Sequence, residues 1–219
     1  MHLFNWQLFC IFFGIMLLIS FLMALQSRHF YTMDVVKRKF SIMDLEIPST
    51  AVELKNLIAG LYNLPPELSR KSISSLRGQL YLDFLYMPFA YGCIIIACSL
   101  ITEKMEHRAG QLVFTALALL QFLSWLFDII ENIYLLLKIR PDVKESSRGV
   151  HKAYLVMEAA KWGIALTGAI CAIAALCYFW LAGNYASASV QYFVIIIVEI
   201  VIFTILFKFA AKTPPQTAA

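Results

Sequence analysis

Two carboxylates and an amide lie about one helical turn apart inside an apolar run. Asp128, Glu131 and Asn132 fall within the segment SWLFDIIENIYLLLK, which covers residues 124–138. Spacings of three and four place all three side chains on one face of a helix. Ionisable groups inside a membrane span cost about 2.5–3.5 kcal/mol each on insertion scales, so they usually face other helices or a water-filled cavity. The segment therefore predicts an inward-facing polar site that could share protons or bind a cation.

Other apolar runs carry ionisable groups that match this face. The run 154–182 holds Glu158 and Lys161, which are three residues apart and share a helix face. The run 79–102 holds Asp83 near its start. At a rise of about 1.5 Å per residue, these groups reach similar depths in the same half of a membrane. We therefore expect one shared site in which Lys161 pairs with carboxylates, formed by Asp83, Asp128, Glu131, Asn132, Glu158 and Lys161.

The charges of this predicted site do not balance. With Glu199 from the run 189–209, five acidic groups face one intramembrane lysine. Full ionisation would leave most of the negative charge uncompensated in a medium of low dielectric constant, which is unfavourable. Shared protons, a bound cation or a cationic ligand would restore the balance. The first interpretation is therefore a protein that binds or moves a proton, a cation or a small amphiphile.

Two other interpretations remain open. The same carboxylates could serve as acid and base in a membrane-embedded enzyme that acts on a lipid. Alternatively, Lys161 and its partners could only lock helices together in a structural or assembly subunit. An enzyme requires an apolar slot that opens sideways to lipid, and a carrier requires a polar path to an aqueous face. A lock requires a fully paired Lys161 with no cavity. For Glu199 alone, a hydrogen bond to a neighbouring helix is the simpler expectation.

Several kinds of site are not expected. The sequence has no Gly-rich phosphate loop, no HExxH motif and no GxSxG motif, and its four histidines lie at segment ends or in loops. The five cysteines fall inside apolar runs without CxxC spacing, which is typical of packing residues. We therefore predict no metal and no cofactor. Basic residues flank the apolar runs and form no single stripe, so nucleic acid is not an expected partner.

Composition indicates an integral membrane protein. Hydrophobic residues make up 61% of the 219 residues and charged residues only 15%, whereas soluble domains hold about a quarter charged residues. Five runs are long enough to cross about 30 Å of hydrocarbon, which takes about 20 helical residues. We place them near 3–25, 79–102, 109–138, 154–182 and 189–209. The predicted fold class is all-α, a polytopic bundle of five transmembrane helices with a small cytosolic strand and helix cap.

Lysine and arginine positions predict the orientation. The connections 26–78 and 138–153 and the C-terminal tail together hold fifteen basic residues, whereas the alternate loops hold only Lys104 and Arg108. Because cytoplasmic loops carry an excess of Lys and Arg, the N-terminus is predicted outside and the C-terminus in the cytosol of a multi-pass protein of the cell membrane. The first run is expected to be retained as a helix. The predicted division is a first helix at 1–26, a cap at 27–78, a four-helix bundle at 79–210 and a tail at 211–219.

The connection 27–78 has its own pattern. Residues 40–47, FSIMDLEI, alternate like a short strand. Thr50 and Glu53 then stand in capping-box spacing at the start of an amphipathic helix. The pair Pro65-Pro66 ends that helix and begins another that leads into the second span. The connection is therefore predicted to form a small cap on the membrane surface.

Two short motifs resemble a group of small, largely uncharacterised multi-spanning membrane proteins of bacteria. The motifs are YLDFLYMPFAY at residues 81–91 and FDIIENIYLL at residues 127–136, and the resemblance extends over about 30 residues. Proteins of that group look similar in having an Asp near the start of one span and an Asp-x-x-Glu-Asn stretch in the next. The resemblance implies that Asp83, Asp128, Glu131 and Asn132 are the shared polar positions. It implies no activity.

Overall fold

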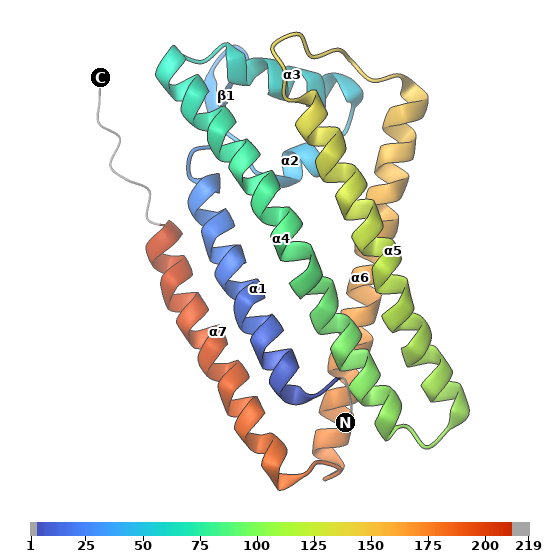
Figure 1. The fold of residues 1–219 in the computed structure, drawn as a ribbon. Helices are drawn as coiled ribbons and strands as arrows, with labels where there is room; N and C mark the ends of the chain where they lie inside the picture. Colours follow the sequence, from blue (N-terminus) through green and yellow to red (C-terminus); the bar gives the residue numbers. More distant parts are fainter. Residues whose placement is uncertain (1–3, 212–219) are drawn as a thin grey trace.

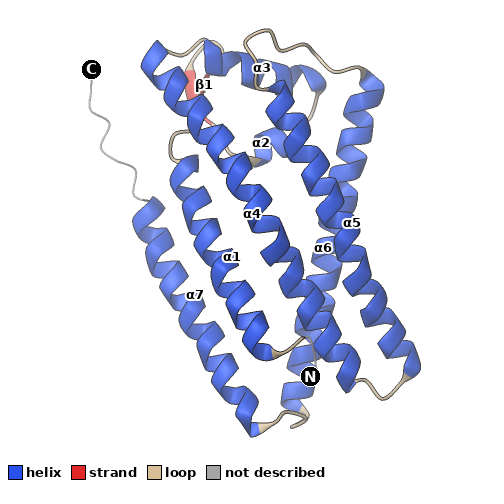
Figure 2. Ribbon diagram, viewed as in Figure 1, coloured by secondary structure: helices blue, strands red, loops and turns tan. Residues whose placement is uncertain are grey.

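The structure, a computed structural model, describes residues 4–211, with side chains described as far as Lys208. The predicted tail at 211–219 lies outside the described residues, apart from Ala211. Helices dominate and the two short strands lie at one end (Figure 2). The elements are α1 (Trp6–Ser27), β1 (Tyr31–Met33), β2 (Lys37–Lys39), α2 (Met43–Glu46), α3 (Ala51–Tyr62), α4 (Pro66–Lys104), α5 (Arg108–Lys138), α6 (Arg148–Leu181), the 3-10 turn η1 (Ser187–Ser189) and α7 (Val190–Ala211).

Five of these helices are long and apolar enough to cross a membrane: α1, α4, α5, α6 and α7. They run roughly parallel or antiparallel as a bundle (Figure 1). The predicted fold class, an all-α multi-span bundle with a small cap, is confirmed. The chain is a multi-span helical membrane protein.

Local signals in the sequence set the helix ends. The Asn5 side chain accepts a hydrogen bond from the Leu8 amide at 2.8 Å, and Ser147 accepts one from the Val150 amide at 3.4 Å. Helix α6 ends where Gly183 takes a left-handed conformation with φ of 73°. That turn lets the Asn184 amide donate to the Phe179 carbonyl at 2.9 Å, which is typical of a glycine helix terminus.

We call β1, β2, α2 and α3 the cap. Strands β1 and β2 pair antiparallel, with Thr32 opposite Arg38. Helix α3 begins as predicted, because Thr50 Oγ1 accepts from the Glu53 amide at 3.1 Å. The Glu53 carboxylate in return accepts from the Ser49 amide at 2.8 Å. The apolar face of α3 is buried in the cap, with Leu54, Leu57, Ile58 and Leu61 at most 2% exposed.

The strand predicted at residues 40–47 is wrong, because this segment contains the one-turn helix α2. The Asp44 carboxylate accepts from the Ser41 amide at 2.7 Å, which closes a turn and begins the helix. Pro48 then stops it after one turn, since a residue before proline is held out of the helical region. The alternation of apolar residues arises because Phe40 and Leu45 are buried in the apolar core of the cap. It does not arise from pairing in a sheet.

Helix α4 joins the cap to the bundle. Its 39 residues extend roughly 58 Å, well beyond about 30 Å of hydrocarbon, so its first turns lie in the cap. Leu76 and Leu80 belong to the cap core together with Leu135 and Ile139 from the end of α5. A second apolar core, around Cys98, Ile101 and Phe114, lies toward the other end of the same helices.

The cap, the α5–α6 connection and the C-terminal end of α7 lie at one end of the bundle, which we call the cap end (Figure 1). These are the segments that carry most of the Lys and Arg, as the charge alternation predicts. The assignment of the cap end to the cytosol stays a prediction. Helix α1 packs against α4 and α7, and α6 packs against α5 and α4. Direct contacts between α1 and α6 are few.

Candidate functional site

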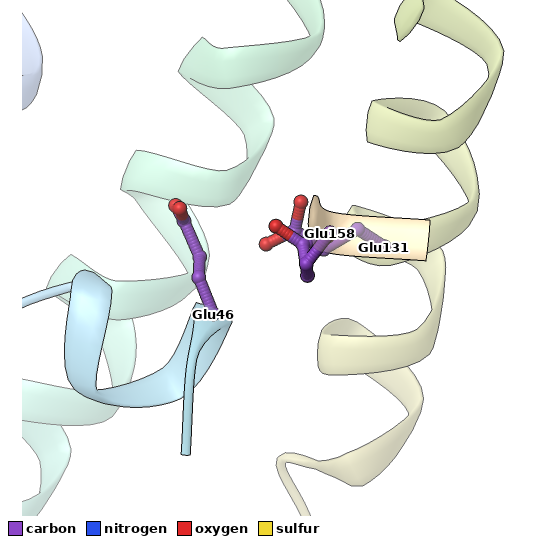
Figure 3. A group of neighbouring side chains, drawn as sticks. All are labelled: Glu46, Glu131 and Glu158. Atoms are coloured by element: carbon purple, nitrogen blue, oxygen red, sulfur yellow. The ribbon is translucent and has the colours of Figure 1, made fainter. Parts of the chain in front are cut away.

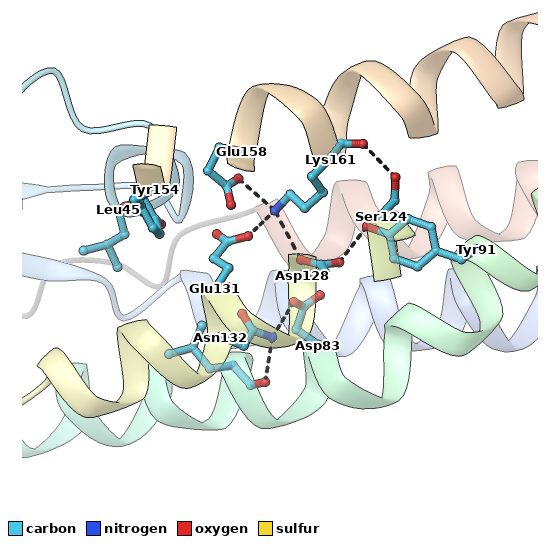
Figure 4. Close-up of polar contacts among 11 residues, drawn as sticks. Leu45, Asp83, Tyr91, Ser124, Asp128, Glu131, Asn132, Tyr154, Glu158 and Lys161 are labelled. Carbon is cyan, nitrogen blue, oxygen red and sulfur yellow. Dashed lines mark hydrogen bonds and ion pairs between the residues drawn. The ribbon is translucent and has the colours of Figure 1, made fainter. Parts of the chain in front are cut away.

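Lys161 of α6 lies at the centre of a buried cluster of charges (Figure 4). Its ammonium nitrogen Nζ is 3.2 Å from Asp128 Oδ1 and 2.9 Å from Glu158 Oε2, and it also bonds Glu131 Oε2. The four residues are between 1% and 9% exposed. Because a charge taken out of water is costly unless paired, this three-fold pairing is what permits a lysine here.

Neutral side chains from α4 and α5 hold the carboxylates in place. The Tyr91 hydroxyl donates to Asp128 Oδ2 at 2.9 Å, so both oxygens of that carboxylate are engaged. Asn132 donates its amide to Asp83 Oδ2 at 2.7 Å, which links α5 to α4. The Ser124 hydroxyl donates to the Lys161 carbonyl at 3.2 Å, which links α5 to α6. The cluster thus joins three helices through polar contacts.

Close packing of the helices supports this arrangement. Gly168 of α6 lies against Gln121 of α5, and a Cβ atom there would come within 2.5 Å of the Gln121 amide nitrogen and 3.0 Å of Ile94 on α4. Gln121 in turn donates to the Ile164 carbonyl at 3.4 Å. The small residue lets α6 approach α4 and α5 closely, as small residues do between membrane helices.

The cap contributes a fifth acid, Glu46, which sequence reasoning missed. The Tyr154 hydroxyl on α6 donates to the Leu45 carbonyl at 3.2 Å, which fixes α2 over the cluster. Burial raises the pKa of Glu46 to about 7, and the carboxylates around it act in the same direction while Lys161 opposes them. The Glu46 side chain points toward Lys161 because the one-turn helix α2 orients it. No pattern in the sequence indicates that orientation.

Three carboxylates meet at this point, from α2, α5 and α6. Oxygen atoms of Glu46, Glu131 and Glu158 all lie within 4.8 Å of one another (Figure 3). Carboxylate oxygens are the ligands that hard cations prefer. Buried oxygens of all three, including Oε1 of Glu131 and Oε1 of Glu158, accept no hydrogen bond within the described part of the chain. The group therefore has acceptor capacity to spare, beside the ammonium of Lys161.

The six predicted site residues come together in the structure. Asp83, Asp128, Glu131, Asn132, Glu158 and Lys161 form one connected set through the bonds above. Lys161 pairs with Asp128 and Glu131, as the spacing on α5 and α6 predicts. Their role in binding a ligand stays a prediction.

Glu199, counted with these acids from its depth, lies elsewhere. It is on α7, which packs on α1, and its carboxylate is next to Gly14, where it would come within 2.7 Å of an added Cβ atom. One of its oxygens is buried without a hydrogen bond in the described residues. Depth alone could not place it, because depth does not say which helices are neighbours. In the structure Glu46 is the fifth acid of the site.

An apolar cavity of about 540 Å³ adjoins the cluster. Its walls come chiefly from α1, α4 and α6, including Phe13, Met16, Ala90, Ala165 and Ala169. At its polar end lie Glu46, Asp83, Asp128 and Lys161. Two lining residues of α6, Leu166 and Ile173, are 52% and 61% exposed on the membrane-facing surface. The cavity therefore reaches the side of the bundle where α1 and α6 leave a space between them.

Comparisons with known proteins give no family for this chain. No protein-family model matches it, and no curated protein or solved structure matches it. The resemblance to a bacterial group on residues 81–91 and 127–136 therefore stays a prediction. What the geometry establishes is a multi-span helical membrane protein with a buried charged cluster, in which Lys161 pairs with Asp128, Glu131 and Glu158.

Proposed function

We propose that this protein binds a small amphiphile, with the apolar chain in the cavity and the polar head at the charged cluster. The observation that carries the proposal is that one cavity has both apolar walls and a charged end. The same cavity has apolar walls along α1, α4 and α6 and has Glu46, Asp83, Asp128 and Lys161 at one end. An apolar pocket with a few convergent polar groups is the usual form of a small-molecule site, and about 540 Å³ is within the usual range of such pockets.

The lateral position of the cavity supports an occupant that comes from the bilayer. Leu166 and Ile173 line the cavity and are also more than half exposed. Few contacts join α1 to α6 along this side. An amphiphile could therefore enter from the lipid without crossing the cap. Mainly apolar walls favour an amphiphile over a free proton or cation, since an ion alone gains nothing from them.

The other interpretations explain less of the structure. An internal lock accounts for the pairing of Lys161 but leaves the cavity beside it without a role. A membrane enzyme acting on a lipid would also use a lateral slot next to carboxylates, and this slot meets that condition. Acid and base catalysis would require, in addition, that a reacting group of the lipid lie between two of these carboxylates. Binding requires no further group, so it is the function that the geometry supports best.

A pair of cavity variants tests the proposal. Ala169→Phe places a ring inside the cavity, whereas Ala174→Phe puts the same ring on an exposed position of α6 that does not line it. Native mass spectrometry of protein extracted from its own membrane is expected to show a retained amphiphile on the wild type and on Ala174→Phe. Ala169→Phe is expected to lack it. Equal retention by both variants would contradict the proposal.

A further inference from the structure

We infer that the head of the bound amphiphile is cationic, an ammonium group that Glu46 and Asp83 receive at the polar end of the cavity. This inference rests on the proposed function, and it names the class of ligand. Three acids and one lysine line the polar end, namely Glu46, Asp83, Asp128 and Lys161. Their neighbours Glu131 and Glu158 add two more carboxyl groups behind Lys161.

The single lysine is already committed. Its Nζ atom contacts Asp128, Glu131 and Glu158. In the described part of the chain, neither Glu46 nor Asp83 has a basic side chain within 4.0 Å, the limit of an ion pair. An anionic head would meet five carboxyl groups and a lysine whose ammonium group is already paired with three of them. A cationic head would meet two carboxyl groups that lack a counter-charge.

Two carboxyl groups next to the polar end of the cavity keep spare acceptors. Glu131 and Glu158 are each 1% exposed, yet each keeps a buried oxygen, Oε1, without a hydrogen bond in the described residues. Glu131 lies within hydrogen-bond reach of Glu158, so a shared proton can serve one oxygen of each, and the remaining acceptors can take a donor from a ligand. This observation is independent of the charge count.

The spacing of the three glutamates suits the same donor. Oxygens of Glu46, Glu131 and Glu158 lie within 4.8 Å of one another. Three oxygens no more than 4.8 Å apart can all be reached from one point at about 2.8 Å or less, which includes the usual N⁺–H···O⁻ distance. Glu46 belongs both to this group and to the cavity wall, so it is the member of the group that a head entering through the cavity meets.

Three amphiphiles of equal chain length test the charge of the head. A long-chain alkylamine, the matching alcohol and the matching alkyl sulfate compete against a chain-brominated amphiphile that quenches the fluorescence of Trp162, a cavity-lining residue. The amine is expected to bind about tenfold more tightly than the alcohol, because charge-assisted hydrogen bonds are the stronger kind. The sulfate is expected to bind most weakly.

Charge-removing variants link this preference to the named residues. Glu46→Gln and Asp83→Asn are each expected to reduce the preference for the amine over the alcohol by up to about tenfold, because the amine loses a charged partner that the alcohol does not use. Neither change strands a lysine, since neither carboxylate pairs with one, and Asp83→Asn keeps an acceptor oxygen for the Asn132 amide. Glu145→Gln, in the exposed α5–α6 connection, is the matched control and is expected to keep the preference.

The outcomes separate the two levels of the argument. If amine and alcohol bind equally, or if the sulfate binds best, the inference about charge is overturned while amphiphile binding stands. If none of the three displaces the probe, and Ala169→Phe changes nothing, the proposed function itself fails. An amine preference that survives both Glu46→Gln and Asp83→Asn would overturn the assignment of the head to these residues.

Discussion

Two regions of this bundle hold carboxylates at membrane depth, and the carboxylates differ in burial and in pairing. In the region of α4, α5 and α6, the carboxylates of Asp128 and Glu131 are buried and bonded to Lys161. At the edge formed by α1 and α7, Glu199 is only partly buried, and its carboxylate lies beside Gly14. None of the 18-residue apolar window of α7 is buried, whereas 28% of the window of α5 is.

The difference shows that a carboxylate becomes part of a site when neighbouring helices supply polar partners. Its depth in the membrane alone does not decide this. Helices α4, α5 and α6 each present polar residues to a shared interior, and small residues such as Gly168 let them approach. Helix α7 contacts α1, where Gly14 lies beside Glu199 and offers it no polar side chain. The cluster is therefore expected to respond strongly to substitution and the edge weakly. The following predictions test that contrast, from the largest expected effect to the smallest.

Removal of the lysine is expected to have the largest effect. Lys161→Met leaves Asp128, Glu131 and Glu158 without their shared cation. Loss of one partner from a buried ion pair typically costs about 3–5 kcal/mol, so the free energy of unfolding in mixed micelles should fall by that amount. Lys152→Met, at an exposed position of α6, is the control and should change it by about 0.5 kcal/mol or less. Similar changes in unfolding free energy for the two variants would show that the charged cluster does not stabilise the fold.

Neutralising one acid in each region compares the regions directly. Asp128→Asn loses the ion pair to Lys161 and weakens the acceptor of the Tyr91 hydroxyl, at an expected cost of about 1–3 kcal/mol in unfolding free energy. Glu199→Gln neutralises a carboxylate that keeps one buried oxygen without a hydrogen bond in the described residues, and should change it by about 0.5 kcal/mol or less. A larger cost for Glu199→Gln than for Asp128→Asn would reverse the contrast.

Two glycines of α6 test the close approach of the helices. Gly168→Ala would force its Cβ against Gln121 and Ile94, and overpacking of this kind costs about 1–3 kcal/mol. At Gly163 nothing lies within 4 Å of the added atom, so Gly163→Ala should instead stabilise the helix, by up to about 1 kcal/mol. Thermal unfolding of both variants in detergent measures this. Changes of the same sign would show that α6 is not held against α5 as described.

The pH dependence should be a smaller effect located in the cap. Burial raises the pKa of Glu46 from 4.5 to about 7, so the folded state binds the proton more tightly than the unfolded state. Its contribution to stability is therefore fully present below about pH 4.5, and it is lost as the pH rises to about 7. Melting temperatures across this window should fall less for Glu46→Gln than for the wild type. Glu67→Gln, exposed at the start of α4, should keep the wild-type slope.

Much of the architecture can be predicted from the sequence, because membrane spans are long and continuous. Apolar length gives the five spans, and spacings of three and four on α5 and α6 place Asp128, Glu131, Glu158 and Lys161 on facing surfaces. Local hydrogen bonding at Ser41 and Asp44, which made α2 a helix, was not visible in the alternation of residues 40–47. Alternation of buried side chains can come from a turn as well as from a strand.

The cavity and Glu46 could not be predicted for a different reason. In a membrane protein, residues that line a cavity and residues that face lipid are both apolar, so Phe13 or Ala169 gives no signal of its own. Glu46 is brought to the site by a tertiary contact between Tyr154 and the Leu45 carbonyl, which are 109 positions apart in the chain. Only the arrangement of neighbouring elements reveals either feature.

Fluorescence quenching at two tryptophans tests the central claim most directly. Single-tryptophan proteins that keep either Trp162, in the cavity wall, or Trp125, on α5 outside it, are titrated with a chain-brominated amphiphile in bilayers. Occupancy of the cavity predicts that Trp162 quenching saturates at a low fraction of amphiphile, whereas Trp125 quenching rises in proportion to the bulk amount. If both tryptophans respond in proportion, with no saturation at Trp162, the cavity holds no amphiphile and the account is contradicted.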